Sequence, residues 1–165
     1  MSNPPEYPPR LSLAQTPTPF HCLARASERW GNGKRLWIKR DDLTGSVLTG
    51  NKVRKLEFIA AHAINHGFRT LVTCGGMQSN HCRATALVAA QLGLRCHLVL
   101  RSDGPDQLNT GNFLLYQIAG ATHEVLPAKG WGKALASAYR RREQTYRDSG
   151  EPALMIPTGG SDSLG

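Results

Sequence analysis

The sequence contains no long hydrophobic run. None of its 165 residues lie in a stretch that is apolar enough and long enough to span a membrane, and the start has no apolar core of the kind found in signal peptides. Residues 1–20 are polar and rich in proline, so we expect an extended arm rather than packed structure there. The resulting expectation is a cytoplasmic protein without a membrane partner.

Cysteine is also scarce, and its spacing shows no pattern. The four cysteines are Cys22, Cys74, Cys82 and Cys96. None are paired at the spacing of zinc or redox motifs, so we interpret them as reduced thiols. His62 and His66 lie four residues apart, but no acidic residue completes a metal-binding motif with them. We therefore predict no metal site.

Acidic side chains are outnumbered, with 12 Asp and Glu against 20 Lys and Arg, which gives a net charge of +8 and an isoelectric point near 9.7. The run Arg140–Arg142, flanked by tyrosines, could bind the phosphates of a nucleic acid. Glu143 and Asp148 interrupt this basic character, which favours an ordinary solvated helix face. The sequence thus does not favour nucleic acid as a partner, and the excess charge also suits attraction of small anions.

Strand and helix patterns alternate along most of the chain. Short β-rich runs occupy residues 36–39, 70–74, 96–100, 122–126 and 152–157, and helical patterns occupy 51–66, 79–92, 109–118 and 133–147. Because strands that alternate with helices usually form parallel sheets, the sequence predicts an α/β fold with a doubly wound parallel sheet.

The segment 50–57, Gly-Asn-Lys-Val-Arg-Lys-Leu-Glu, places a lysine at the start of a predicted helix. A helix over 51–66 puts Lys52 on the core-facing side, above Leu56 and Ile59, and puts Lys55 at the polar edge. An ammonium group on that side loses hydration, which favours the neutral, nucleophilic amine. Lys52 is therefore the candidate for covalent chemistry, unless its side chain simply extends into water.

The segment 75–81, Gly-Gly-Met-Gln-Ser-Asn-His, joins a strand to the next predicted helix. Free backbone N–H groups and the positive end of the helix dipole make such a junction an anion site. Ser79 and Asn80 add side-chain hydrogen bonds, so a carboxylate or a phosphate is the expected ligand. The alternative is an ordinary loop in which Ser79 only caps the helix.

Four motifs together resemble a known family. Lys-Arg-Asp-Asp at 39–42, the segments 50–57 and 75–81, and Ile-Pro-Thr-Gly-Gly-Ser at 156–161 occur in the order and at the spacing of one group of pyridoxal-phosphate enzymes. This group is the D-cysteine desulfhydrase and 1-aminocyclopropane-1-carboxylate deaminase family, which has the tryptophan synthase β-like fold (fold type II). The resemblance covers about residues 8–165.

The resemblance implies a role for each matching residue. Lys52 matches the lysine that bonds covalently to pyridoxal 5'-phosphate and later moves the substrate's proton. Asn80 matches the asparagine that binds the phenolic oxygen of the cofactor ring, and Ser79 matches the serine near the substrate carboxylate. Ser79, Asn80 and His81 together would contact the substrate, and His81 is typical of the desulfhydrases, whereas the deaminases tend to have glutamine.

The implied activity is a lyase that converts D-cysteine to pyruvate, sulfide and ammonia, and the alternative substrate is 1-aminocyclopropane-1-carboxylate. The family's chains are longer and form homodimers, and their glycine-rich phosphate loop and catalytic tyrosine have no match here. Gly159–Ser161 is a weaker candidate for that loop. We therefore expect a truncated chain, which leaves a catalytically inactive fragment as a further alternative.

The resemblance also predicts a division into domains. Residues 1–50 would form an N-terminal arm and the first strand of a larger domain. Residues 51–150 would form the smaller α/β domain that carries the cofactor lysine. Residues 151–165 would begin the return into the larger domain.

Overall fold

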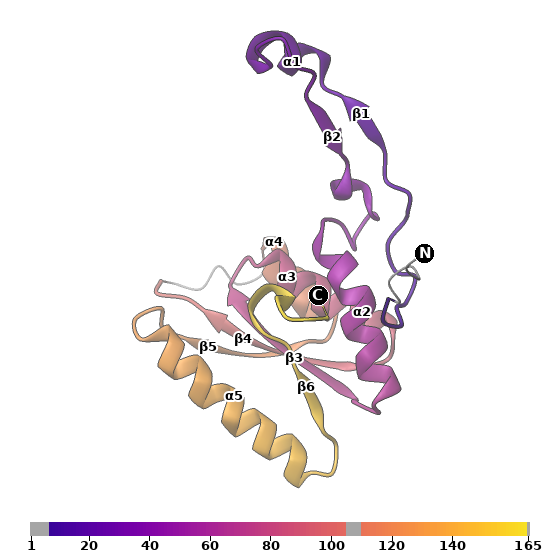
Figure 1. The fold of residues 1–165 in the computed structure, drawn as a ribbon. Helices are drawn as coiled ribbons and strands as arrows, with labels where there is room; N and C mark the ends of the chain where they lie inside the picture. The colour runs from indigo at the N-terminus through magenta and orange to yellow at the C-terminus, as the bar shows by residue number, and fades with distance from the viewer. Residues whose placement is uncertain (1–6, 105–109, 165) are drawn as a thin grey trace.

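A computed structural model describes residues 7–104 and 110–164. A long arm, residues 8–50, projects from an α/β body, residues 51–164 (Figure 1). The arm contains β1 (Phe20–Cys22), α1 (Ala24–Trp30), β2 (Trp37–Lys39) and a 3-10 turn, η1 (Asp41–Leu43). The body contains α2 (Lys52–Asn65), β3 (Thr70–Gly76), α3 (Asn80–Gln91), β4 (Arg95–Arg101), α4 (Gly111–Ile118), β5 (Thr122–Leu126), α5 (Trp131–Asp148), β6 (Ala153–Met155) and the 3-10 turn η2 (Thr158–Gly160).

The body is built on a four-stranded parallel sheet with the order β5-β4-β3-β6. Helices α2, α3 and α4 cover one face of this sheet, and α5 covers the other (Figure 1). The predicted doubly wound parallel α/β fold is thereby confirmed. The chain leaves β3 toward β4 and β5, and then returns to place β6 on the opposite side of β3.

The core lies between the sheet and the three helices on one face. Leu71 of β3 and Leu98 of β4 are completely buried there, against Leu56 of α2 and Val88 of α3. Small residues allow this close approach, because α3 and α2 each bury three alanines, at Ala84, Ala86, Ala89, Ala60, Ala61 and Ala63. A smaller cluster of Cys74, Val99 and Ala138 fixes α5 to the other face.

The arm is a hairpin that the sequence only half predicted. Strand β1 pairs antiparallel with the predicted β2, with Phe20 opposite Lys39, and α1 connects the two strands. The rings of Phe20 and Trp37 stack with centroids 5.1 Å apart, yet the two residues stay 65% and 49% exposed. Helix α1 buries no residue at all. β1 and α1 were missed because three-residue strands and a seven-residue helix carry too little periodic pattern to be detected.

Glu57 of α2 fastens the start of the arm to the body. Its carboxylate Oε1 accepts hydrogen bonds from the backbone N–H groups of Leu13 and Ala14, both at 3.0 Å, and its carbonyl oxygen accepts one from Leu11. Ala14 is 6% exposed and Glu57 5%. The expectation that residues 1–20 lack packed structure is therefore wrong for this segment, because a buried acidic side chain replaces the sheet or helix partner that its backbone lacks.

The predicted element boundaries need three corrections. The Gly75–Gly76 pair does not end β3, which continues through Gly76 because both residues pair with β4. Strand β6 is shorter than predicted and half-buried. Helix α4 begins at Gly111, and the predicted start at Asn109 lies outside the described residues.

The predicted domain boundary at residues 150 and 151 falls between α5 and β6. Strand β6 pairs with β3 inside the same sheet, with Val72 opposite Met155. Nothing else bears on the assignment of residues 1–50 and 151–165 to a larger domain, so that division stays a prediction.

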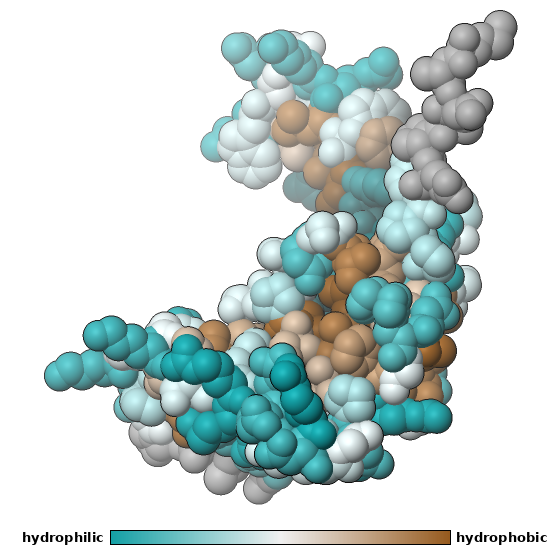
Figure 2. All heavy atoms as spheres, turned by 60° about the horizontal axis from the view of Figure 1, so that its bottom comes forward, coloured by the Kyte–Doolittle hydropathy of each residue, from teal (hydrophilic) through white to brown (hydrophobic). Residues whose placement is uncertain are grey.

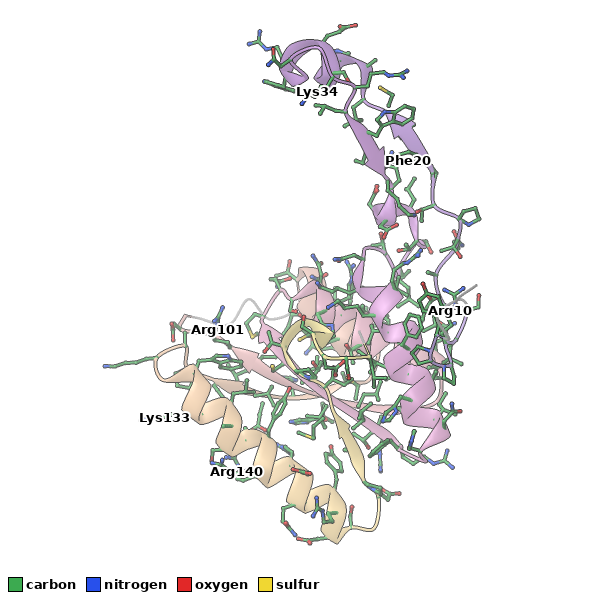
Figure 3. The ribbon with its side chains drawn as sticks, viewed as in Figure 1. Arg10, Phe20, Lys34, Arg101, Lys133 and Arg140 are labelled. Atoms are coloured by element: carbon green, nitrogen blue, oxygen red, sulfur yellow. The ribbon has the colours of Figure 1, made fainter. Side chains whose placement is uncertain are left out.

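The surface differs between the arm and the body. Hydrophobic surface gathers on the arm and where the arm meets the body, whereas the lower part of the body is hydrophilic (Figure 2). Lys133 and Arg140 project from α5, and Lys34 lies near the tip of the arm (Figure 3). Glu124 of β5 binds two other arginines of α5, Arg141 at 3.1 Å and Arg142 at 2.9 Å. In the described ranges, no helix is both long and apolar enough to cross a membrane.

Candidate functional site

Two strands end side by side at one edge of the sheet. We call this region the switch edge. It consists of the carboxyl ends of β3 and β6, the segments that follow them, residues 77–81 and 156–161, and the start of α2, residues 52–55, which contacts the second segment. The backbone N–H of Ile156 donates to Val72 at 2.8 Å, and the Cys74 thiol lies 3.1 Å from the Thr158 hydroxyl. The chain leaves β3 toward β4 and later returns to place β6 on the other side of β3, so the switch edge has the position where open α/β sheets bind ligands.

Ser79 organises the turn between β3 and α3. It is the N-cap of α3, with extended backbone dihedrals, and its hydroxyl oxygen accepts the N–H of Cys82 at 3.2 Å. A Cβ at Gly75 would lie 2.7 Å from the Ser79 side chain, so only glycine fits there. Since the cap uses the oxygen of Ser79 as an acceptor, the O–H stays available as a donor. The first N–H groups of α3 have no acceptor inside the helix, which is the arrangement predicted for an anion site.

His81 is buried beneath the switch edge, with 3% of its surface exposed. Its Nε2 lies 3.0 Å from the hydroxyl of Thr73, and that hydroxyl is 3.3 Å from the carbonyl of Ile156. Since a carbonyl only accepts, the Thr73 hydroxyl donates to Ile156 and accepts the proton of Nε2. Nδ1 is then an acceptor without a partner in the described structure.

Burial keeps this ring neutral. It lowers the pKa of His81 from 6.5 to about 4, and the positive charges of Lys52 and Lys55 add to the effect. Because the charges of Lys52 and Lys55 affect this pKa, both ammonium groups lie within electrostatic range of His81. The histidine is therefore held as a neutral acceptor at neutral pH, next to two cations.

Lys52 begins α2 and is half-buried, above the fully buried Leu56 and the nearly buried Ile59, as its predicted position on the core-facing side requires. Within the described part of the chain its amine makes no hydrogen bond or ion pair. The loop before α2 fixes the position of Lys52. In this loop the buried Thr44 hydroxyl lies within hydrogen-bonding distance of three carbonyl oxygens, those of Asp41, Leu48 and Gly50.

Lys55, predicted at the polar edge of the helix, has a contact that the sequence did not predict. Its amine donates to the carbonyl of Gly160 at 3.3 Å and to the hydroxyl of Ser161 at 3.1 Å. Gly160 also lies close to His81, since an added Cβ would be 3.2 Å from Cε1 of the ring. Lys55 thus ties α2 to the turn after β6 and closes one side of the switch edge.

Asn80 follows the cap and is exposed at the start of α3. Its Oδ1 accepts a hydrogen bond from Asn112 of α4 at 3.0 Å. The structure therefore brings Lys52, Ser79, Asn80 and His81 to the first turns of two neighbouring helices. It adds Lys55, Thr73 and Asn112, whose contacts no local pattern predicts, because each also binds a partner distant in sequence.

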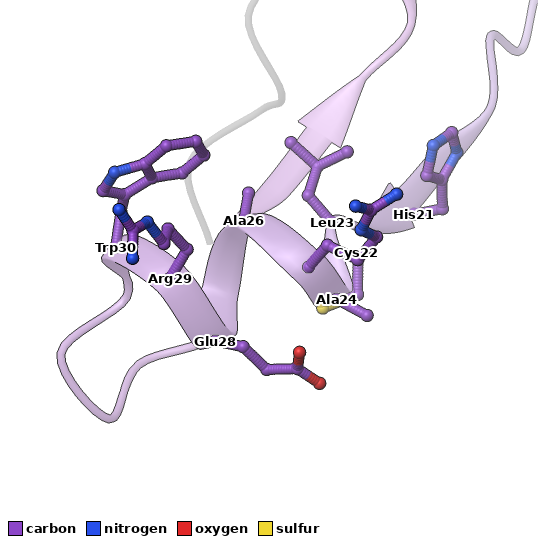
Figure 4. Close-up of a pocket in the computed structure, with 9 residues that line it drawn as sticks. His21, Cys22, Leu23, Ala24, Ala26, Glu28, Arg29 and Trp30 are labelled. Carbon is purple, nitrogen blue, oxygen red and sulfur yellow. The ribbon is translucent and has the colours of Figure 1, made fainter.

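A separate hollow of the described surface lies elsewhere. It has a volume of about 960 Å³ and is formed by β1 and α1 of the arm, between side chains such as His21, Glu28 and Trp30 (Figure 4). The hollow is an open crease around one short helix, and none of the predicted site residues lines it. Its side chains do not converge on a common point as those of the switch edge do, so we place the candidate site at the switch edge. No group of three or more metal-binding side chains occurs in the part of the chain that the structure describes.

Comparison with known proteins gives many similar chains, among them the following three. A bifunctional D-cysteine desulfhydrase/1-aminocyclopropane-1-carboxylate deaminase of Arabidopsis thaliana, named mitochondrial, is 41% identical over 94% of this chain and 39% of its own length. A D-cysteine desulfhydrase of Klebsiella pneumoniae is 42% identical over 95% of this chain and 48% of its own. The solved structure of an ACC deaminase homologue matches with a TM-score of 0.83 at 36% identity, over 95% of this chain and 46% of that one.

The chain thus spans about half the length, or less, of these relatives. A family model described as "Pyridoxal-phosphate dependent enzyme" matches residues 11–163, which include the arm, the sheet and every residue of the switch edge. The fold, the order of the motifs and this match agree, and we conclude that the chain belongs to the pyridoxal-phosphate dependent enzyme family.

Proposed function

We propose that the chain is part of a pyridoxal-phosphate-dependent lyase that converts D-cysteine to pyruvate, sulfide and ammonia. The single observation that carries this proposal is the placement of Lys52 and the Ser79–Asn80 turn at the start of adjacent helices, α2 and α3, at the switch edge. Deamination of 1-aminocyclopropane-1-carboxylate is the second candidate, because the Arabidopsis relative is named for both activities.

The residues of the switch edge fit the cofactor. An amine without a protein partner, Lys52, can hold an aldehyde group covalently. A helix start with unused N–H groups suits an anionic group, and the exposed Asn80 amide suits a phenolic oxygen. The partnerless Nδ1 of His81 indicates that a donor outside the described chain completes this part of the site.

Pyridoxal phosphate supplies an electron sink that stabilises negative charge on the substrate carbon next to the amino group. The chain's own side chains supply the proton movements and the orientation. Lys52 takes and returns a proton at Nζ, with the positive charge of Lys55 nearby. Ser79 donates its O–H to the substrate carboxylate while the helix cap holds its oxygen in place.

His81 is the residue on which the choice of D-cysteine rests. The family resemblance makes histidine at this position typical of the desulfhydrases, and its neutral ring keeps a buried acceptor, Nδ1, beneath the site. We therefore place D-cysteine first among the substrates.

A spectrum tests the cofactor proposal directly. Purified protein is mixed with pyridoxal phosphate, freed of excess, and compared with Lys52→Ala, Lys55→Ala and Lys34→Ala. We expect a visible absorption band in the unmodified protein, in Lys34→Ala and, more weakly, in Lys55→Ala, but none in Lys52→Ala. Lys34 is the matched control because it is exposed near the tip of the arm.

A folded chain without the band would support the alternative of a catalytically inactive fragment. Binding to nucleic acid that falls steeply with salt would support the remaining alternative. Pairing into homodimers and a cytoplasmic location stay predictions, and the Arabidopsis relative is named for a different compartment. Size-exclusion chromatography with light scattering tests the first of these.

A further inference from the structure

A side chain from a different part of the sequence holds the turn that carries Asn80. Asn112 lies in the first turn of α4, beside the start of α3 (Figure 1). Its backbone N–H donates to Oε1 of Gln78 at 2.7 Å, and its Nδ2 donates to the carbonyl of Gln78 at 2.8 Å. The same Nδ2 donates to Oδ1 of Asn80 at 3.0 Å.

The partners of Asn112 allow only one orientation of its amide. Arg83, which can only donate, contacts Oδ1 of Asn112 through Nη1 at 3.3 Å. The carbonyl of Gln78, which can only accept, contacts Nδ2. Rotating the amide by 180° would place oxygen against oxygen and nitrogen against guanidinium, so the assigned orientation is the one that satisfies both neighbours.

The orientation of Asn112 in turn fixes that of Asn80. Because Asn112 presents a donor, the atom of Asn80 that faces it must be the acceptor, Oδ1. The donor of Asn80, Nδ2, is then left without an acceptor within the described residues. One asparagine thus decides which end of the other asparagine's amide is free.

Arg83 extends this network to the catalytic lysine. Its Nη2 donates to the carbonyl of Thr49 at 3.1 Å, in the loop that leads into α2 and Lys52. Arg83 is half-buried. Its two terminal nitrogens connect the loop before Lys52 with the side-chain amide of Asn112, which binds Asn80. One guanidinium group thus contacts both the loop before Lys52 and the side chain that binds Asn80.

We infer that Asn112 is a positioning residue that holds the amide of Asn80 with Nδ2 free to donate to an anionic ring oxygen of pyridoxal phosphate. The inference rests on the proposed function, since that function supplies the acceptor. If the amide of Asn80 turned over, its Oδ1 would oppose that anionic oxygen, and a favourable hydrogen bond would become a repulsion.

The test uses two substitutions at Asn112 and one matched control. Asn112→Asp keeps the shape and the contact with Arg83 but replaces the donor to Asn80 and to the Gln78 carbonyl by an acceptor, which favours the reversed amide of Asn80. Asn112→Ala removes the donor without adding charge. Asn65→Asp makes the same chemical change at the exposed end of α2, so it controls for the added negative charge.

The first readout needs no cofactor. In nuclear magnetic resonance spectra of the unliganded protein, we expect the side-chain N–H protons of Asn112 to exchange slowly and those of Asn80 to exchange rapidly. In Asn112→Asp the protons of Asn80 should become protected and shift downfield, because they now donate to the new carboxylate. Unchanged Asn80 resonances would overturn the claim that Asn112 sets the amide.

The second readout is cofactor affinity by spectroscopic titration. We expect Asn112→Asp to weaken pyridoxal phosphate binding about tenfold or more, Asn112→Ala by a smaller factor, and Asn65→Asp by less than about twofold. The pH at which the visible band titrates should also move in Asn112→Asp. A general loss of structure would not move it.

A double substitution separates positioning from mere support of the fold. If Asn112 acts through Asn80, Asn112→Asp should add little to the loss of affinity already caused by Asn80→Ala. Equal losses with and without Asn80 would overturn the inference. A wild-type chain that binds no pyridoxal phosphate would overturn the proposed function and the role of Asn80 Nδ2 as a donor to the cofactor. The nuclear magnetic resonance experiment would still decide the orientation of the Asn80 amide.

Discussion

The arm and the body of this chain differ in what holds them together. The body buries Leu56, Leu71 and Leu98 completely between the sheet and its helices. The arm exposes its largest side chains, and its stacked pair Phe20 and Trp37 covers little more than itself. All four predicted site residues lie in the body, where packing fixes the ends of α2 and α3. Positions for chemistry are therefore supplied by the region with a core, while the arm is held by hydrogen bonds to that region and by Leu11, Leu13 and Leu48, which pack against its core.

The comparison predicts, first, that truncating a leucine costs much more folding stability in the body than in the arm. Leu98→Ala should reduce the free energy of unfolding by about 2–5 kcal/mol, because it leaves a cavity between β4 and the helices. Leu36→Ala, in the arm at a residue that is 38% exposed, should change it by less than about 1 kcal/mol. Urea unfolding followed by circular dichroism measures both. Equal losses would mean that arm and body share one core.

Acid should weaken the body through His81. The unfolded histidine binds a proton near its ordinary pKa of 6.5, whereas the folded one stays neutral down to about 4. The unfolded state therefore binds more protons between these values, so stability is fully present above about pH 6.5 and falls as the pH is lowered toward 4. The loss should reach about 3 kcal/mol at most.

Unfolding of His81→Gln at pH 7 and pH 4.5 tests this, with His66→Gln on the exposed end of α2 as the control. The pH dependence should be smaller in His81→Gln than in the unmodified protein and unchanged in the control. Parallel pH dependences in all three proteins would contradict a neutral buried ring.

A substitution at the junction between the arm and the body should have the smallest effect on stability. Glu57→Gln keeps an acceptor for the N–H groups of Leu13 and Ala14 but removes its charge, so the attachment should weaken by about 1 kcal/mol. Hydrogen exchange at these two amides should become several times faster while global stability changes little. Glu28→Gln, at an exposed position of α1, is the control and should leave both amides unchanged.

The features predicted from the sequence are those that neighbouring residues specify. The apolar spacing over residues 51–66 gave α2 within about one residue at each end, and the β-rich run 122–126 is β5 itself. Ser79 could be identified as a cap because its hydroxyl binds a residue three positions later. In these cases the spacing of residues along the sequence matches the spacing of their contacts in the structure.

The missed features depend on contacts between distant residues. Glu57 looks like a surface carboxylate in its helix, yet it is buried because residues 13 and 14 cover it. Lys55 and Asn112 are likewise ordinary polar residues until the turn after β6 and the turn before α3 lie against them. Their roles follow from the three-dimensional fold, and no local pattern encodes them.

The position of β6 also sets an order of assembly. Its pairing with β3 joins residues about eighty positions apart, and Lys55 must find Gly160 across 105 positions. During synthesis, at about 5–20 residues per second, the edge of β3 that pairs with β6 therefore stays unpaired for several seconds. An unpaired hydrophobic strand edge can pair with other chains. The contact that completes the candidate site is thus also the one that ends the period in which the growing chain is most open to aggregation.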